Sequence, residues 1–240
     1  MSRRRTAVIV GVGPGLGMAM ARRFGREGFR VAVLSRGAGR HGGYLADLAA
    51  HGIEAESHTV DVADGDRLQA VLEKIGAEND IDLLYYGPGP TTQSIVPIAD
   101  IDVTTAQSAF EWVWPAVRAV GVVLPGMLDR GAGALLFAGG LSSVRPMPML
   151  GQLALATAAL RNYALTLNSA LAEHGVYAGT LTIGGLVVGG DIHAMVTADP
   201  AKYGAAEGHT LDPDRIATTA WDMYRQRNRA EEVFDAVSAR

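Results

Sequence analysis

The first 28 residues hold the feature that most limits the folds open to this chain: an apolar strand, a glycine-rich turn and a helix in direct succession. Residues 6–10 are a short apolar run typical of a buried strand, and residues 18–28 have the spacing of an amphipathic helix. Four glycines lie between them: Gly11, Gly13, Gly15 and Gly17. Glycine lets backbone N–H groups approach a ligand, and a helix N-terminus carries partial positive charge. The unit predicts a site for a nucleotide pyrophosphate, the alternative being a turn whose glycines serve only the fold.

Strands and helices alternate along the rest of the chain, which is the pattern of parallel βαβ units. Further strands are expected at residues 29–35, 54–60, 81–86, 133–138 and 177–183. Helices are expected at residues 44–50, 67–75, 106–128, 151–173 and 211–224. This order predicts the α/β class, with a doubly wound parallel sheet (a Rossmann fold) in a single domain over residues 1–240. Pro115 should kink or restart its helix, and residues 231–240 are poor strand candidates apart from Val233 and Phe234.

Residues 184–210 break the alternation and are expected to be irregular. Gly189 and Gly190 lie near the start of this segment and Pro200 lies in its middle. The segment follows a predicted strand, and ligands of doubly wound sheets bind at the carboxyl ends of the strands. It is therefore predicted to be a mobile flap over the site, the alternative being a plain connection.

Composition excludes several classes of function. The net charge is −4 and the basic residues are scattered, so no nucleic-acid partner is expected. No apolar run is long enough to span a membrane, and Arg3–Arg5 is interpreted as a solvated flank rather than part of a signal peptide. The chain has no cysteine, and its six histidines lack the spacing of metal ligands. We expect a cytoplasmic protein without a metal site.

The end of the second predicted strand suggests which dinucleotide binds. Ser35 and Arg36 lie where such a fold meets the adenosine ribose. An acidic side chain there binds the 2′-hydroxyl of NAD(H), whereas an arginine suits the 2′-phosphate of NADP(H). Arg36 therefore favours NADP(H), unless it is only a surface arginine. Arg22 and Arg40 are weaker candidates for the same phosphate.

The spacing G-x-x-x-G-x-G of Gly11, Gly15 and Gly17 resembles that of the short-chain dehydrogenase/reductase family, and the resemblance extends over essentially the whole chain. It includes segments at residues 81–84, 124–127 and 158–160. It implies that Asp61 and Val62 contact the adenine, although Asp61 also suits a helix N-cap. The cofactor-binding candidates are Gly11, Gly13, Pro14, Gly15, Leu16, Gly17, Ser35, Arg36, Asp61, Val62, Gly87 and Gly184.

The chain departs from this family at the positions that carry its chemistry. The resemblance implies a Tyr-x-x-x-Lys pair that acts as the acid or base, but Leu153 stands at the Tyr position and Thr157 at the Lys position. Gly140 stands at the position of the family's serine, which Ser142 could replace if the loop takes two extra residues. Candidate proton donors are Tyr86, Ser142, Asp191, His193 and Tyr203. The substrate pocket is expected to include Trp112, Gly140, Met149 and Leu153.

Three functions are compatible with these residues. The first is an NADPH-dependent oxidoreductase that reduces a small organic substrate (C=O, C=N or polarised C=C) with a relocated proton donor. The second is a non-redox isomerase, dehydratase or cyclase on the same scaffold. The third is a non-catalytic protein that binds NADP(H) or regulates a partner. The glycine turn and Arg36 favour the first. The apolar helices expected at 106–128 and 151–173 resemble the family's subunit interface, so a homodimer or homotetramer is expected.

Overall fold

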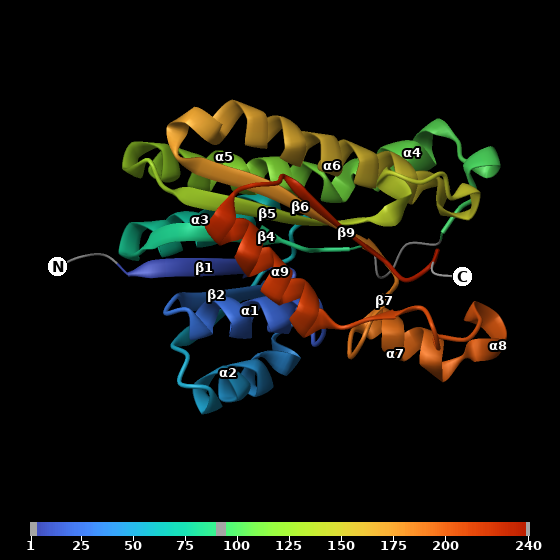
Figure 1. Cartoon of the computed structure of the whole chain (residues 1–240), viewed down its shortest axis with the longest axis horizontal. Helices are drawn as coiled ribbons and strands as arrows, with labels where there is room; N and C mark the ends of the chain where they lie inside the picture. Colours follow the sequence, from blue (N-terminus) through green and yellow to red (C-terminus); the bar gives the residue numbers. More distant parts are fainter. Residues whose placement is uncertain (1–3, 90–94, 239–240) are drawn as a thin grey trace.

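A seven-stranded parallel sheet forms the centre of the computed structural model, which describes residues 4–89 and 95–238 (Figure 1). Its strands are β1 (Arg5–Val10), β2 (Arg30–Ser35), β3 (Ala55–Thr59), β4 (Asp80–Tyr86), β5 (Gly133–Gly140), β6 (Val176–Gly184) and β9 (Glu231–Asp235). They lie in the order β3-β2-β1-β4-β5-β6-β9, with every neighbouring pair parallel. The strand order reverses between β1 and β4, and this reversal opens a crevice at their carboxyl ends. The predicted doubly wound α/β fold is confirmed.

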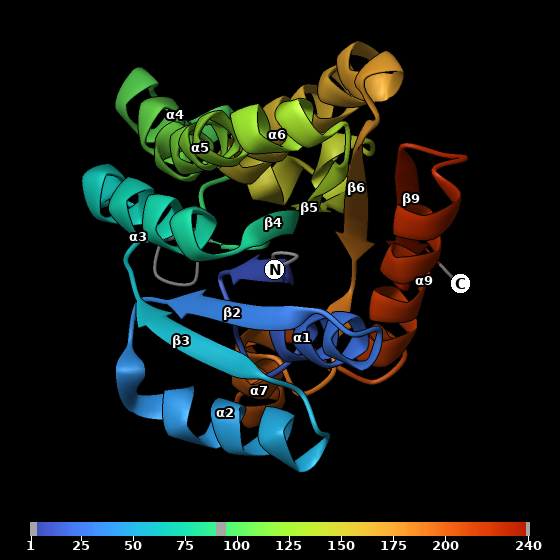
Figure 2. The ribbon, with the colours of Figure 1, turned by 90° about the vertical axis from the view of Figure 1, so that its left-hand side faces the viewer.

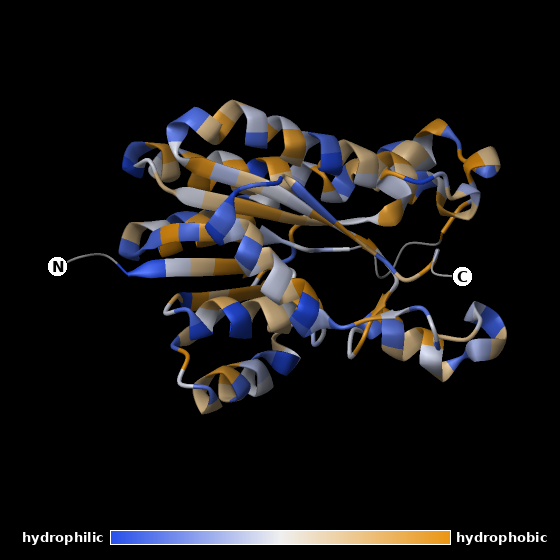
Figure 3. Ribbon diagram, in the orientation of Figure 1, coloured by the Kyte–Doolittle hydropathy of each residue, from blue (hydrophilic) through white to orange (hydrophobic). Residues whose placement is uncertain are grey.

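Helices cover both faces of the sheet (Figure 2). One face carries α1 (Leu16–Arg26), α2 (His41–Ala50) and α9 (Pro213–Gln226), and the other carries α3 (Gly65–Glu78), α5 (Trp114–Arg130) and α6 (Gly151–Leu171). Along β1, Ala7 and Ile9 pack in the first layer, whereas Val8 and Val10 pack in the second. Side chains alternate between the faces of a strand, so a sheet covered on both faces needs apolar residues throughout. Figure 3 shows this apolar character in the strands.

The helix expected at residues 106–128 is two helices. The first, α4 (Val103–Ala109), is followed by a 3₁₀ turn at Phe110–Trp112, and α5 then begins at Trp114. Pro115 lies in the first turn of α5, where a helix needs no N–H donor from it. The predicted restart at Pro115 is therefore confirmed.

The segment expected to be irregular is largely ordered. It contains β7 (Leu186–Val187), α7 (Asp191–Ala198) and α8 (Pro200–Tyr203), and β7 pairs with β8 (Thr210–Leu211) in a small second sheet. The expectation of irregular structure was wrong because elements this short carry too few apolar positions to show a period.

The weak expectation for a strand at residues 231–240 was also wrong, since β9 pairs in parallel with β6 over five residues. β9 lies at the edge of the sheet, where charged side chains are tolerated. Glu231 accepts hydrogen bonds from Arg161 Nε and from Thr182 Oγ1, both at 2.7 Å. These hydrogen bonds hold the Glu231 carboxylate at the start of β9.

At the N-terminus, Arg3 lies outside the described residues, whereas Arg5 begins β1 and pairs with Asp82 at 3.3 Å. The backbone of Arg5 is therefore part of the sheet, while its side chain stays exposed. Over residues 4–89 and 95–238, none of the helices has both the length and the apolar character needed to cross a membrane.

Candidate functional site

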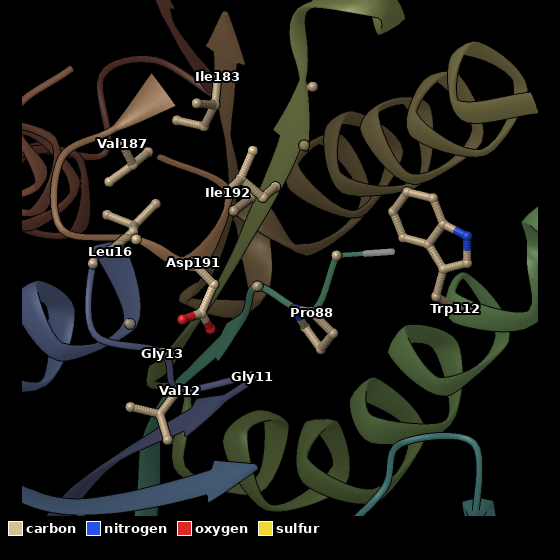
Figure 4. Close-up of a pocket in the computed structure, with 18 of the residues that line it drawn as sticks. Gly11, Val12, Gly13, Leu16, Pro88, Trp112, Ile183, Val187, Asp191 and Ile192 are labelled. Carbon is tan, nitrogen blue, oxygen red and sulfur yellow. The ribbon is translucent and has the colours of Figure 1, made fainter. Parts of the chain in front are cut away.

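A cavity of about 940 Å³ lies at the carboxyl ends of the strands (Figure 4). It extends from the loop after β2, across the glycine turn, to the start of α6. In Figure 4, Trp112 lies on the opposite side of the cavity from Leu16 and Val187. All of the predicted cofactor residues line it: Gly11, Gly13, Pro14, Gly15, Leu16, Gly17, Ser35, Arg36, Asp61, Val62, Gly87 and Gly184. The fold thus brings these residues together, while their binding of a cofactor stays a prediction.

The glycine turn has the geometry of a cradle for an anion. A Cβ atom at Gly11, whose φ is +83°, would meet the backbone nitrogen of Pro88 at 2.6 Å, and one at Gly17 would meet Val12 Cα at 2.8 Å. A Cβ atom at Gly13 would meet nothing within 4 Å, because this residue borders the cavity. Within the described chain, no side chain caps the start of α1 and no acidic residue lies in its first turn. The turn therefore has room and partial positive charge for a pyrophosphate.

The loop after β2 forms the end of the cavity where the ribose was predicted. Ser35 Oγ lies 2.8 Å from Nε2 of the buried His41. Burial, with a smaller contribution from His58, lowers the pKa of His41, so its imidazole is neutral at pH 7. Arg36 lines this end, as predicted. Arg22 does not line the cavity and pairs with Asp47 at 3.1 Å, which removes it as a phosphate candidate.

Arg40 and Asp191 join this end of the cavity to α7. Arg40 Nη1 donates to Asp191 Oδ1 at 2.8 Å and to Oδ2 at 2.9 Å, and both residues line the cavity. The hydrogen bond that Arg40 donates to Asp191 is the largest cause of the raised pKa of Arg40, so the guanidinium is charged throughout the physiological range. Asp191 is therefore an ion-pair partner and a poor proton donor.

A pair of hydroxyl groups lies at the opposite end, between β5 and α6. Ser142 Oγ lies 3.1 Å from Thr157 Oγ1, which itself donates to the Leu153 carbonyl oxygen at 2.7 Å. Since a threonine hydroxyl has one proton, Ser142 is the donor of the pair. A Cβ atom at Gly140 would lie 3.5 Å from Ser142 Oγ. The Ser142 hydroxyl therefore lies beside the position that a serine at 140 would use.

Of the two tyrosines at the end of β4, the one that lines the cavity is Tyr85 and not the predicted Tyr86. Tyr86 is buried on the other face of the sheet and donates to the Trp112 carbonyl oxygen at 2.8 Å. Tyr85, one residue earlier, lines the cavity because successive strand residues point to opposite faces. A Cβ atom at Gly87 would meet the Tyr85 hydroxyl at 2.4 Å, so this glycine leaves room for the ring. The choice of Tyr86 as a proton donor was wrong.

Two other candidates lie outside the cavity. Met149 is 67% exposed, and Met147 lines the wall in its place. Tyr203 lies on α8 with Lys202 Nζ 5.0 Å from its ring centre, away from the cavity. Trp112, Gly140, Ser142, Leu153, Asp191 and His193 do line it.

Several lining residues were missed by sequence reasoning. They are Tyr44, Tyr85, Glu111, Leu141, Leu150, Ile192, His209 and Val237. Alternation along β4 is the signal that could have identified Tyr85. His209 reaches the wall because β8 pairs with β7, and its Nδ1 lies 3.1 Å from the Ala236 carbonyl oxygen. Among the described residues, no three histidine or acidic side chains are grouped to hold a metal ion.

Residues 5–194 match the family model of the short-chain dehydrogenases. A very-long-chain 3-oxoacyl-CoA reductase of Aspergillus clavatus is 25% identical over 182 residues, covering 71% of this chain and 50% of that protein. A protein of Streptomyces coelicolor with the provisional name ketoacyl reductase is 31% identical over 140 residues, covering 54% of this chain and 51% of that protein. The chain thus spans about half the length of these curated relatives.

Solved structures share the fold over nearly the whole chain. The L-sorbose reductase of Gluconobacter frateurii, complexed with NADPH and L-sorbose, has a TM-score of 0.84 at 20% identity, covering 98% of this chain and 96% of that one. A short-chain oxidoreductase of Pseudomonas aeruginosa PAO1, whose catalytic centre is called atypical, has a TM-score of 0.84 at 15% identity, covering 98% and 97%. With the glycine turn, the strand order and the match over residues 5–194 in agreement, the chain belongs to the short-chain dehydrogenase family.

Proposed function

We propose that this chain is an NADP(H)-dependent oxidoreductase that reduces a small organic substrate at a C=O, C=N or polarised C=C bond. The observation that carries the proposal is the cavity that joins the glycine turn at one end to the Ser142–Thr157 hydroxyl pair at the other. The names of the relatives support it, since they include reductases and a 1-deoxy-11-beta-hydroxypentalenate dehydrogenase of Streptomyces avermitilis. Similar structures that contain NADP or NADPH support the choice of cofactor.

The chain's own residues divide the cofactor between them. The turn from Gly11 to Gly17 and the start of α1 would hold the pyrophosphate. Ser35 and Arg36 would hold the phosphorylated ribose, and Asp61 with Val62 would border the adenine. The nicotinamide, when bound, supplies the hydride, so the protein has to supply position and a hydrogen-bond donor.

Ser142 is the proposed donor to the substrate. Its hydroxyl would rotate from Thr157 to the substrate atom on which negative charge develops and would stabilise that charge by a hydrogen bond, while the proton that completes the reduction would come from His193 or from water. Leu153, at the position of the family's tyrosine, cannot donate a proton. His193 on α7 is the second candidate for the acid. Substrates that gain little negative charge, such as an iminium ion or a polarised alkene, would suit this site best.

The walls around Ser142 favour a substrate whose surface is largely apolar. The side chains there are mainly apolar: Trp112, Leu141, Met147, Leu150 and Leu153. Val187 and Ile192 come from the proposed flap at residues 184–210 and extend the apolar wall. Asp191 lies on the same flap but is neutralised by Arg40.

The first test is a titration with NADPH and NADH, followed through tryptophan emission because Trp112 lines the cavity. We expect tight NADPH binding, weaker NADH binding, and about a tenfold loss of NADPH affinity in Arg36→Ala. A screen of ketones, imines and activated alkenes then follows NADPH absorbance, with Ser143→Ala as the matched control for Ser142→Ala. Ser143 Oγ donates to the Gly140 carbonyl oxygen at 2.8 Å and is already occupied. If neither nucleotide binds, the proposal is wrong.

A non-redox enzyme or a non-catalytic NADP(H)-binding protein is the second candidate function, favoured by Leu153 and Thr157 at the positions of the family's acid pair. Formation of one NADP⁺ per product separates the first proposal from both.

We also propose a homodimer or homotetramer, because α5 leaves Trp114 62% exposed, with Val117 and Leu128 also exposed on this helix. Light scattering of the purified chain tests this.

A further inference from the structure

The ion pair between Arg40 and Asp191 connects two parts of the cavity that are far apart in sequence. Arg40 ends the 3₁₀ turn at Ala38–Arg40, directly after the predicted ribose site, whereas Asp191 is the first residue of α7 on the flap. The flap also lies against the glycine turn, because a Cβ atom at Gly15 would meet Gly190 Cα at 3.0 Å. The pair therefore ties the flap to the end of the cavity where a 2′-phosphate would bind.

Arg40 cannot bind Asp191 and a 2′-phosphate independently, because both groups would be held by the same guanidinium. Its Nη1 makes both bonds to the carboxylate. A phosphate monoester carries nearly two negative charges at pH 7 and competes strongly for a guanidinium. If the phosphate displaces Asp191, the flap loses its partner. If the guanidinium bridges both groups, it has fewer N–H donors left for the phosphate than it would have without Asp191. In either case Asp191 opposes a ligand with a 2′-phosphate and leaves one without it nearly unaffected.

We propose that Asp191 is a determinant of cofactor specificity: it competes with the 2′-phosphate for Arg40, so that NADPH weakens the tie between the flap and Arg40 whereas NADH leaves it in place. The inference rests on the cofactor site proposed above. It gives Asp191 a role outside proton donation and makes flap release depend on which nucleotide is bound.

The effect has a modest upper limit. The two side chains are 59% and 49% exposed, and exposed ion pairs contribute up to about 1 kcal/mol, which corresponds to about a fivefold change in affinity. Asp191→Asn should therefore tighten NADPH binding by up to about fivefold and change NADH binding by less than about twofold. Arg40→Gln should weaken NADPH binding. In the Arg40→Gln background, Asp191→Asn should have no further effect on NADPH affinity.

The binding test is a double-mutant cycle on the full chain, measured by calorimetry with NADPH and NADH at constant salt. Glu207→Gln removes the same charge from the same flap without touching Arg40 and serves as the matched control. The inference would be overturned if Asp191→Asn changed the affinities for NADPH and NADH equally, or if it raised the affinity for NADPH by the same factor with and without Arg40. Either result would leave the proposed function intact. An absence of binding of either nucleotide to the wild-type chain would overturn both.

Hydrogen exchange of residues 188–203 gives a second readout that does not depend on turnover. We expect faster exchange in ligand-free Asp191→Asn and Arg40→Gln than in the wild type. Arg40→Gln breaks the pair without altering α7, so faster exchange there cannot come from loss of the Asp191 charge at the helix start. At saturation, the wild-type flap should exchange faster with NADPH than with NADH, and Arg40→Gln should abolish this difference. Equal flap exchange with both nucleotides in the wild type would contradict the inference.

Discussion

Gly13 offers a test of the glycine turn that separates binding from folding. Its φ is not in the left-handed region, and a Cβ atom there would meet nothing within 4 Å. Gly13→Asn and Gly13→Asp add side chains of nearly the same shape, and only the second adds a charge. Neither should disturb the fold, and the carboxylate should stabilise the start of α1 by about 0.3–1 kcal/mol.

The same carboxylate should prevent a pyrophosphate from binding. At a separation of about 4–6 Å and an effective dielectric constant of about 20, two like charges repel by about 3–4 kcal/mol, or between 100-fold and 1,000-fold in affinity. In the wild type, NADPH at 100 times its dissociation constant should stabilise the chain by about 2.7 kcal/mol. In a domain of this size that amounts to a rise of about 5–11 °C in the melting temperature.

Thermal unfolding with and without NADPH measures both effects. Gly13→Asn should lose part of the rise caused by NADPH, because its side chain enters the cavity that Gly13 borders. Gly13→Asp should lose nearly all of the rise, while its ligand-free melting temperature stays equal to or above that of the wild type. If the two variants respond equally to NADPH, the turn does not hold the pyrophosphate, and the assignment of this end of the cavity is wrong.

Three further predictions follow from individual contacts. Gly17→Ala should destabilise the chain by about 1–3 kcal/mol in urea unfolding, because its methyl group would meet the backbone of Val12 at 2.8 Å. Ser142→Ala should lower turnover by about 100-fold in steady-state assays with NADPH affinity unchanged. The hydrogen bond from Arg161 is the main cause of the lowered pKa of Glu231. The ionised Glu231 carboxylate therefore stabilises the folded chain above about pH 4.5, and this stabilisation declines as the pH falls and the carboxylate is protonated. The free energy of unfolding of Glu231→Gln, measured across pH 3–7, should lack this decline. A decline as steep as that of the wild type would contradict the prediction.

Much of the proposed cofactor end of the cavity could be predicted from the sequence because its signals are local. The turn with Gly11 and Gly17 lies directly between a strand and a helix, and Arg36 directly follows a strand. In a parallel sheet, all of these strand ends lie at one edge, so residues found by local pattern also meet in space. The alternation of strands and helices predicted the layers for the same reason, since periodicity reports which faces are buried.

The residues at the proposed substrate end of the cavity depended on contacts between distant segments. Only the phase of β4 in the sheet decides that Tyr85 lines the cavity and Tyr86 does not. The position of Ser142 beside Thr157 depends on how β5 packs against α6. No local pattern distinguishes Met147 from the exposed Met149, because the loop that carries them has no regular period.

What the sequence alone determined was therefore the α/β class, the order of the elements and the residues of the glycine turn. All of these follow from local preference and from periodic burial. The tertiary structure decided the edge strand β9, the short helices between residues 184 and 210 and the pairing of Arg40 with Asp191. These features depend on charge compensation and packing between segments far apart in the chain, and only the folded chain brings such groups within reach of one another.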